Sequence, residues 1–156
     1  MQRAEQRKSV LVVDDNRDNR VILSTILESA GYGVHQASDG AQAVRLVRRG
    51  VADVVLMDLC MPRMDGWQAT RVIRSDPAVA HVPIVAVTAL ASHRDGSLLE
   101  GGEWNAVLFK PIPLQDVLAA VARCVGGAGE GAAPRQAGPR RLTAATPLLH
   151  PPGTWG

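Results

Sequence analysis

The chain has 156 residues, of which 46% are hydrophobic and only 3% aromatic, so we expect one domain with an aliphatic core. The formal net charge of +2 is too small to indicate a protein that binds nucleic acid or membranes, and we expect neither direct DNA binding nor membrane association. The basic character belongs to the two ends of the chain, because residues 10–125 carry a net charge of −2.

The two cysteines, Cys60 and Cys124, are far apart and form no CxxC pattern. They therefore indicate neither a disulfide framework nor a zinc site, and they favour a reducing compartment. The first apolar run, Val10–Val13, is too short for a signal peptide or a membrane span. We expect a cytoplasmic protein.

Short apolar runs alternate with helical patterns five times along the chain. In chain order, we expect a strand over Ser9–Val13, a helix over Arg17–Ala30, a strand over Gly33–Ala37, a helix over Gly40–Arg49 capped by Asp39, a strand over Asp53–Met57, a helix capped by Asp65 that ends near Ser75, a strand over Pro83–Val87, a helix over Ser92–Glu100, a strand over Glu103–Phe109 and a helix over Pro113–Val125.

Strict alternation with short links predicts a parallel sheet covered by helices on both faces. The central runs are continuously apolar, as strands buried on both faces should be. We expect a flavodoxin-like α/β fold with five parallel strands in the order 2-1-3-4-5. The folded domain should cover residues 9–125, after a flexible N-terminus over residues 1–8. Residues 126–156 hold seven Gly and five Pro without apolar periodicity, which is typical of a flexible, disordered tail.

Polar side chains follow the predicted strands at one end, where the functional crevice of such a sheet lies. Three carboxylates, one hydroxyl and one lysine should meet there: Asp14 and Asp15 after the first strand, Asp58 after the third, Thr88 after the fourth and Lys110 after the fifth.

Three neighbouring carboxylates repel one another, and a divalent cation relieves this repulsion. Mg²⁺ prefers hard oxygen ligands, usually one or two carboxylates together with waters and phosphate oxygens. A lysine and a hydroxyl beside them suit the oxygens of a phosphoryl group. The combination predicts a Mg²⁺-dependent site in which a carboxylate is the nucleophile and becomes an acyl phosphate.

Four segments, in this order and at these intervals, carry a resemblance to a known family. They are Val13-Asp14-Asp15-Asn16, Met57-Asp58-Leu59-Cys60-Met61-Pro62-Arg63-Met64-Asp65-Gly66, Val87-Thr88-Ala89-Leu90-Ala91 and Phe109-Lys110-Pro111-Ile112. Over about Ser9 to Val125 the chain resembles the response-regulator receiver family, of the chemotaxis-regulator-like, stand-alone type. The Asp-Asp-Asn-x-x-Asn-Arg opening is similar to receivers of hybrid kinases and of stand-alone cell-cycle regulators.

The resemblance implies a role for each site residue. Asp58 would accept a phosphoryl group from the phosphohistidine of a histidine kinase or a histidine phosphotransfer protein, and a downstream effector protein would read the signal. The metal site would consist of Asp15, Asp58 and the backbone carbonyl of Cys60, with Asp14 holding a metal-bound water. Lys110 would contact a phosphoryl oxygen, Thr88 would move toward the phosphoryl group, and the Lys110–Pro111 bond would be cis.

Other interpretations of the same residues stay open at this point. Asp14 and Asp15 could cap the first helix, and Cys60 could be either a small tolerated side chain or a redox-sensitive thiol. Val107 stands three residues before Lys110, where many receivers carry Tyr or Phe, and we expect Phe109 to point to the other face of its strand.

Two other functions compete with the receiver. A phosphohydrolase with an aspartyl-phosphate intermediate usually needs a second acid two residues after its nucleophile, and this chain has Cys60 there. A docking module whose binding does not depend on phosphorylation would not require the acceptor set. We therefore expect a signalling protein that assists its own phosphorylation and dephosphorylation, and not a metabolic enzyme.

Overall fold

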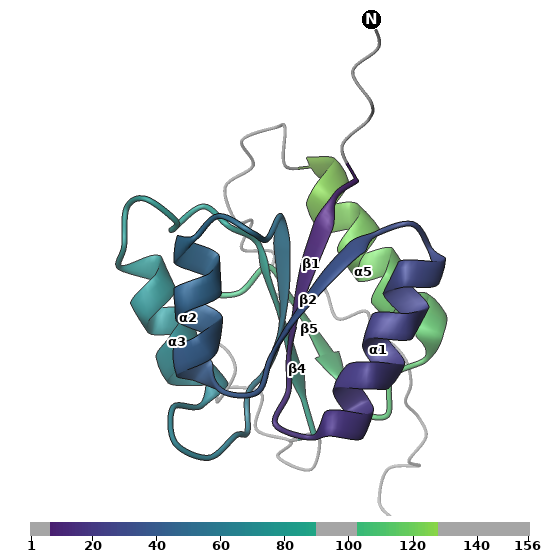
Figure 1. Cartoon of the computed structure of the whole chain (residues 1–156), viewed down its shortest axis with the longest axis horizontal. Coiled ribbons are helices and arrows are strands. Elements are labelled where there is room, and N and C mark those ends of the chain that lie inside the picture. The colour runs from purple at the N-terminus through teal and green to yellow at the C-terminus, as the bar shows by residue number, and fades with distance from the viewer. Residues whose placement is uncertain (1–6, 90–102, 128–156) are drawn as a thin grey trace, which may run out of the picture.

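The structure, a computed structural model, describes residues 7–89 and 103–127 (Figure 1). In chain order its elements are β1 (Ser9–Val13), α1 (Arg17–Ser29), β2 (Gly33–Ala37), α2 (Gly40–Arg48), β3 (Val54–Asp58), α3 (Gly66–Arg74), β4 (Ile84–Thr88), β5 (Ala106–Phe109) and α5 (Leu114–Gly127). The helix expected over Ser92–Glu100 lies outside the described residues, as do most of the flexible ends expected over residues 1–8 and 126–156.

The strands form one parallel sheet in the order β2-β1-β3-β4-β5, which confirms the predicted flavodoxin-like topology. Helices α1 and α5 cover one face of this sheet, and α2 and α3 cover the other (Figure 1). The register aligns the carboxyl ends of neighbouring strands, with Val13 opposite Met57 and Asp58 opposite Val87. Residues that follow these strands are therefore brought to one rim of the sheet.

Alternate residues of each central strand enter two separate cores, because successive side chains of a strand point to opposite faces. Leu11 and Met57 pack with α2 and α3, whereas Val12 and Leu56 pack with α1 and α5. All four side chains are at most 1% exposed. Burial on both faces explains why the strand sequences are continuously apolar.

The last strand is shorter than expected and begins at Ala106. The residues before it contact α3 instead. Arg74 of α3 donates hydrogen bonds to Glu103 O (2.9 Å) and Asn105 Oδ1 (3.0 Å). The expectation that Phe109 and Val107 face opposite ways is wrong. Residues two apart share a face of a strand, and both are more exposed than Leu108, which lies between them in the core.

Polar residues begin the helices by accepting hydrogen bonds from backbone N–H groups of the first turn. Asp39 and Asp65 cap α2 and α3 as predicted, and Asp65 forms a capping box with Gln68. The residue that caps α1 is Asn16, so the interpretation of Asp14 or Asp15 as that cap is wrong. None of the helices within residues 7–89 and 103–127 combines the length and apolar character that crossing a membrane requires.

Candidate functional site

The structure brings the predicted site residues together at the carboxyl rim of the sheet. Asp14 follows β1, Asp58 and Thr88 are the last residues of β3 and β4, and Lys110 follows β5. Asp14, Asp58 and Thr88 are at most 4% exposed, whereas Asp15 is exposed to solvent. The site therefore has a buried polar floor and an open side.

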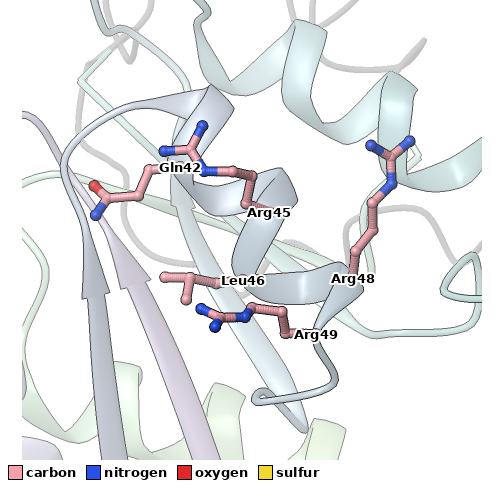
Figure 2. A pocket seen from close by; sticks show the side chains of 5 residues that line it. All are labelled: Gln42, Arg45, Leu46, Arg48 and Arg49. Carbon is pink, nitrogen blue, oxygen red and sulfur yellow. The ribbon is translucent and has the colours of Figure 1, made fainter.

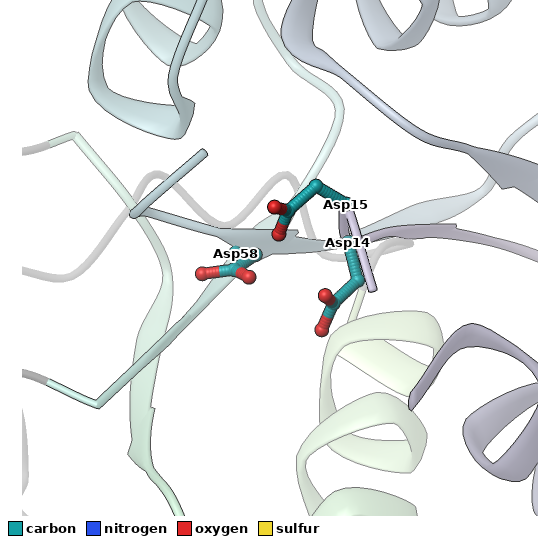
Figure 3. Close-up of side chains that lie close together, drawn as sticks. All are labelled: Asp14, Asp15 and Asp58. Atoms are coloured by element: carbon teal, nitrogen blue, oxygen red, sulfur yellow. The ribbon is translucent and has the colours of Figure 1, made fainter. Parts of the chain in front are cut away.

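Asp14, Asp15 and Asp58 form an acidic cluster (Figure 3). One ligand atom from each of the three carboxylates lies within 4.8 Å of the other two. This spacing and the exclusively oxygen donors fit a hard divalent cation such as Mg²⁺, which keeps several waters when few protein ligands bind it. The exposed carboxylate of Asp15 leaves room for those waters.

Lys110 joins two of these carboxylates. Its Nζ lies 3.3 Å from Asp14 Oδ2 and 3.4 Å from Asp58 Oδ2. Burial alone would lower the pKa of Lys110, but the charges of Asp58 and Asp14 outweigh burial and raise that pKa. Lys110 thus stays a cation, held between two carboxylates of the site.

The carboxyl group of Asp58 is strongly perturbed. Burial raises its pKa from 3.8 to about 6, and the charge of Asp14 adds to this shift. The Cys60 backbone N–H, which donates to Asp58 Oδ1 at 3.0 Å, and the Lys110 ammonium act in the opposite direction. The protonated form is therefore favoured up to about pH 6, and a cation in the cluster would favour the ionised form.

Cys60 lies beside the acceptor with an exposed side chain. Its sulfur is still partly shielded from water by the neighbouring groups, and this desolvation and then the Asp58 charge raise the pKa of its thiol, while a hydrogen bond with the Thr88 side chain only partly offsets them. A raised pKa keeps the sulfur as a thiol, and the thiolate is the reactive form. The electrostatics of the site thus argue against a redox-sensitive Cys60.

Close backbone contacts fix the ends of the strands. The Lys110 N–H donates to Thr88 O at 2.8 Å, which ties the end of β5 to β4, and the Lys110–Pro111 peptide bond is cis, as predicted. On the other side of Asp58, Gly66 begins α3 directly against the Asp58 backbone, and a Cβ at this position would lie 2.8 Å from Leu59 Cα. Gly66, next to the predicted cap Asp65, therefore lets α3 pack closely against the end of β3.

Three polar residues around Asp14 received no role from the sequence. The Asn16 N–H donates to Asp14 Oδ1 (2.9 Å), Asn19 Nδ2 to Asp14 Oδ2 (3.4 Å), and Arg20 Nη1 to the Asp14 carbonyl (2.8 Å). All three belong to the Asp-Asp-Asn-x-x-Asn-Arg opening, in which Asn19 and Arg20 lie three and four residues after Asn16, in the first turns of a helix that starts beside Asp14.

A shallow hollow of about 430 Å³ lies elsewhere, on α2 (Figure 2). Its lining residues are Gln42, Arg45, Leu46, Arg48 and Arg49. Because α2 runs from the carboxyl rim of the sheet to the opposite rim, its arginines lie toward the end of the helix that is away from the acidic cluster. The hollow is not part of the candidate site.

Comparisons with known proteins agree with this geometry. The family model of the response regulator receiver domain matches residues 10–122. The polar-differentiation response regulator DivK of Brucella anthropi is 31% identical over 121 residues, covering 78% of this chain and 98% of DivK, and DivK of Brucella abortus matches equally well.

Solved structures give the same result. The receiver domain of the sensor histidine kinase PA1611 from Pseudomonas aeruginosa, described with a magnesium ion coordinated in its active-site cleft, is 36% identical with a TM-score of 0.72, covering 78% of this chain and 99% of that domain. The chemotaxis response regulator CheY4 of Vibrio cholerae is 27% identical with a TM-score of 0.66, covering 76% of this chain and 99% of CheY4. Receiver domains are signalling proteins that interact with histidine kinases and downstream effectors, and the match spans most of this chain. The chain belongs to the response regulator receiver domain family.

Proposed function

We propose that this chain is a single-domain response regulator of a two-component system or phosphorelay that accepts a phosphoryl group on Asp58 in a Mg²⁺-dependent reaction. The observation that carries the proposal is the Lys110 ammonium between two buried carboxylates, 3.3 Å from Asp14 and 3.4 Å from Asp58, beside the exposed Asp15. This arrangement supplies a nucleophile, a fixed cation and a set of metal ligands at one solvent-accessible rim.

The donor of the phosphoryl group is the phosphohistidine of a histidine kinase or a histidine phosphotransfer protein. An Asp58 carboxylate oxygen forms a bond to phosphorus while the bond between phosphorus and the imidazole nitrogen breaks. The electron pair of the broken bond stays on the imidazole, which takes up a proton from solvent. The transfer is mainly a matter of alignment and of charge stabilisation on the phosphoryl oxygens.

The protein's own residues contribute to each part of this transfer. The Cys60 N–H holds Asp58 Oδ1, so that the carboxylate is oriented before the donor arrives. Lys110 neutralises charge on a phosphoryl oxygen, and the fully buried Thr88 offers a hydroxyl at the neighbouring strand end. Asp15, Asp58 and the Cys60 carbonyl would hold Mg²⁺, and Asp14 would hold one of its waters. When bound, the ion supplies charge neutralisation for the carboxylates and the phosphoryl group.

We further propose that the protein works in the cytoplasm and signals through altered binding to an effector protein. The matching family model and the receiver-type relatives support this reading. The domain would comprise residues 9–125, between the flexible segments expected over residues 1–8 and 126–156.

The test is phosphorylation by acetyl phosphate with Mg²⁺, followed by intact-mass measurement. We expect the mass gain of one phosphoryl group in the wild-type chain, and no gain in Asp58→Asn or when EDTA removes the metal. Asp53→Asn is the matched control, because Asp53 precedes the same strand at its opposite end, where it accepts a hydrogen bond from the Ser9 N–H. Labelling that persists in Asp58→Asn, or that is absent from the wild type, would contradict the proposal.

A further inference from the structure

One oxygen of Asp14 carries two side-chain donors. Asp14 Oδ2 lies 3.3 Å from Lys110 Nζ and 3.4 Å from Asn19 Nδ2. The other oxygen, Oδ1, receives the Asn16 N–H at 2.9 Å. Because Asp14 is only 2% exposed, its hydrogen bonds come mainly from these protein groups and not from bulk water.

Lys110 is shared between Asp14 and Asp58. The proposed function, on which this inference rests, requires Lys110 to turn toward a phosphoryl oxygen on Asp58. That movement weakens its contact with Asp14 Oδ2 and leaves a buried carboxylate oxygen with one donor fewer. A buried charged group that loses a hydrogen bond is costly, so the loss would resist the movement of Lys110.

We propose that Asn19 is a positioning residue that holds Asp14 Oδ2 while Lys110 turns from Asp14 to the phosphoryl group. Asn19 suits this role because its backbone is fixed close to Asp14. The Asn19 N–H donates to the capping side chain of Asn16 at 2.9 Å, and the next residue, Arg20, donates to the Asp14 carbonyl at 2.8 Å. The half-buried Asn19 amide is neutral, so it satisfies Asp14 without competing with Lys110 for the phosphoryl group.

Two substitutions separate this role from a merely structural one. Asn19→Ala keeps the backbone N–H that the cap uses and improves helix propensity, so α1 should not be weakened. Asn19→Asp keeps the shape of the side chain but replaces the donor by an acceptor and adds a negative charge beside the cluster. The first variant removes the donor; the second also strengthens the pull of the cluster on cations.

The experiment measures two quantities for each variant: the dissociation constant of Mg²⁺ by calorimetric titration, and the rate of phosphorylation by acetyl phosphate at saturating Mg²⁺. We expect both variants to be phosphorylated about 3- to 10-fold more slowly, since one hydrogen bond to a charged group is lost. The two should move Mg²⁺ affinity in opposite directions, with Asn19→Asp binding Mg²⁺ more tightly than wild type and Asn19→Ala no more tightly. Asp18→Asn is the control, because Asp18 lies exposed on the same turn; its rate should stay within about 2-fold of wild type.

Phosphorylation of Asn19→Ala at the wild-type rate would overturn the inference. It would also be overturned if Asn19→Asp lost Mg²⁺ affinity together with rate, because packing damage would then explain both variants. These results differ from failure of the proposed function, which would show itself as a wild-type chain that is not phosphorylated on Asp58; the inference would fall with it.

Discussion

Gly66 lies directly against the backbone carbonyl of Asp58. A methyl group at position 66 would meet that carbonyl and would lie 2.8 Å from Leu59 Cα, so α3 or the end of β3 would have to move. We expect Gly66→Ala to lower the free energy of unfolding by about 1–3 kcal/mol, as overpacking does. It should also slow phosphorylation of Asp58. Urea denaturation and the acetyl phosphate assay measure the two effects.

Gly126 provides the matched control, because it also lies in a helix and a Cβ there would have no neighbour within 4 Å in the described part of the chain outside its own helix. Gly126→Ala should leave the free energy of unfolding unchanged or raise it by up to about 1 kcal/mol through helix propensity. If Gly66→Ala were as stable as Gly126→Ala, the contact between α3 and Asp58 would not be a constraint.

The raised pKa of Asp58 predicts how stability changes with pH in metal-free buffer. The unfolded carboxyl ionises near 3.8, whereas the folded one keeps its proton up to about pH 6. Between these values the folded state binds more protons, so the free energy of unfolding should fall as pH rises and remain lower at neutral pH. Asp58→Asn should remove this decrease in the free energy of unfolding. The variant should therefore be about 1–3 kcal/mol more stable than wild type at pH 7.5 in EDTA.

Thermal or urea unfolding at several pH values checks this prediction. Asp18→Asn, which removes an exposed carboxylate of α1, is the control, because the part of the pH dependence that comes from Asp58 should persist in it. An Asp58→Asn variant that is less stable than wild type at pH 7.5 would mean that Asp58 is stabilising in the ionised form.

Mg²⁺ should reverse the destabilisation caused by the ionised carboxylates. A ligand that binds the folded state stabilises it by mass action, and the ligating carboxylates must lose their protons first. We therefore expect Mg²⁺ to raise the unfolding temperature at pH 7.5, and its affinity to fall as pH drops below about 6. Calorimetric titration at pH 5 and pH 7.5 measures this change. Equal affinities at the two pH values, or an unaltered Mg²⁺ response in Asp58→Asn, would be inconsistent with metal binding at Asp58.

The sequence predicted the fold and the position of the acidic rim because both depend on local patterns. Five apolar runs such as Val10–Val13 alternate with helical patterns. The residue that follows a run is therefore predicted to lie at the carboxyl rim of the sheet. Short right-handed connections and the burial of the central strands then restrict the sheet to a few possible strand orders. The caps Asp39 and Asp65 followed from the same local reasoning.

The long-range polar contacts were not predictable in this way. Nothing in the sequence near Arg74 indicates that its guanidinium would bind the segment before β5, about 30 residues later. Arg74 takes up the Glu103 carbonyl, and the last strand begins at Ala106 and not at Glu103. Asn19 belongs to the Asp-Asp-Asn-x-x-Asn-Arg opening, but its role was not predictable for a similar reason, because its partner oxygen also binds Lys110, which lies 96 residues after Asp14.

The two described tryptophans, Trp67 and Trp104, form an edge-to-face pair with ring centroids 4.9 Å apart. Trp67 lies in the first turn of α3, and Trp104 lies in the segment before β5. The ring contact therefore connects these two parts of the chain. We expect a coupling free energy of about 0.5–1.5 kcal/mol in a double-mutant cycle of Trp67→Leu and Trp104→Leu, measured by urea denaturation. Additive effects of the two substitutions would show that the ring contact contributes no specific stability.

Arg74 connects α3 to the segments on either side of β4. Its side chain donates to four oxygens: Glu103 O (2.9 Å), Ala80 O (2.8 Å), Val82 O (2.7 Å) and Asn105 Oδ1 (3.0 Å). Lysine keeps the charge but cannot reproduce the planar fork, so carbonyls would lose their donors. We expect Arg74→Lys to lower the free energy of unfolding by about 2–4 kcal/mol in urea denaturation. Arg71→Lys, on the exposed face of the same helix, should change it by less than about 0.5 kcal/mol. Similar values for the two variants would mean that water or lysine replaces the guanidinium without loss, and that Arg74 does not stabilise the segment before β5.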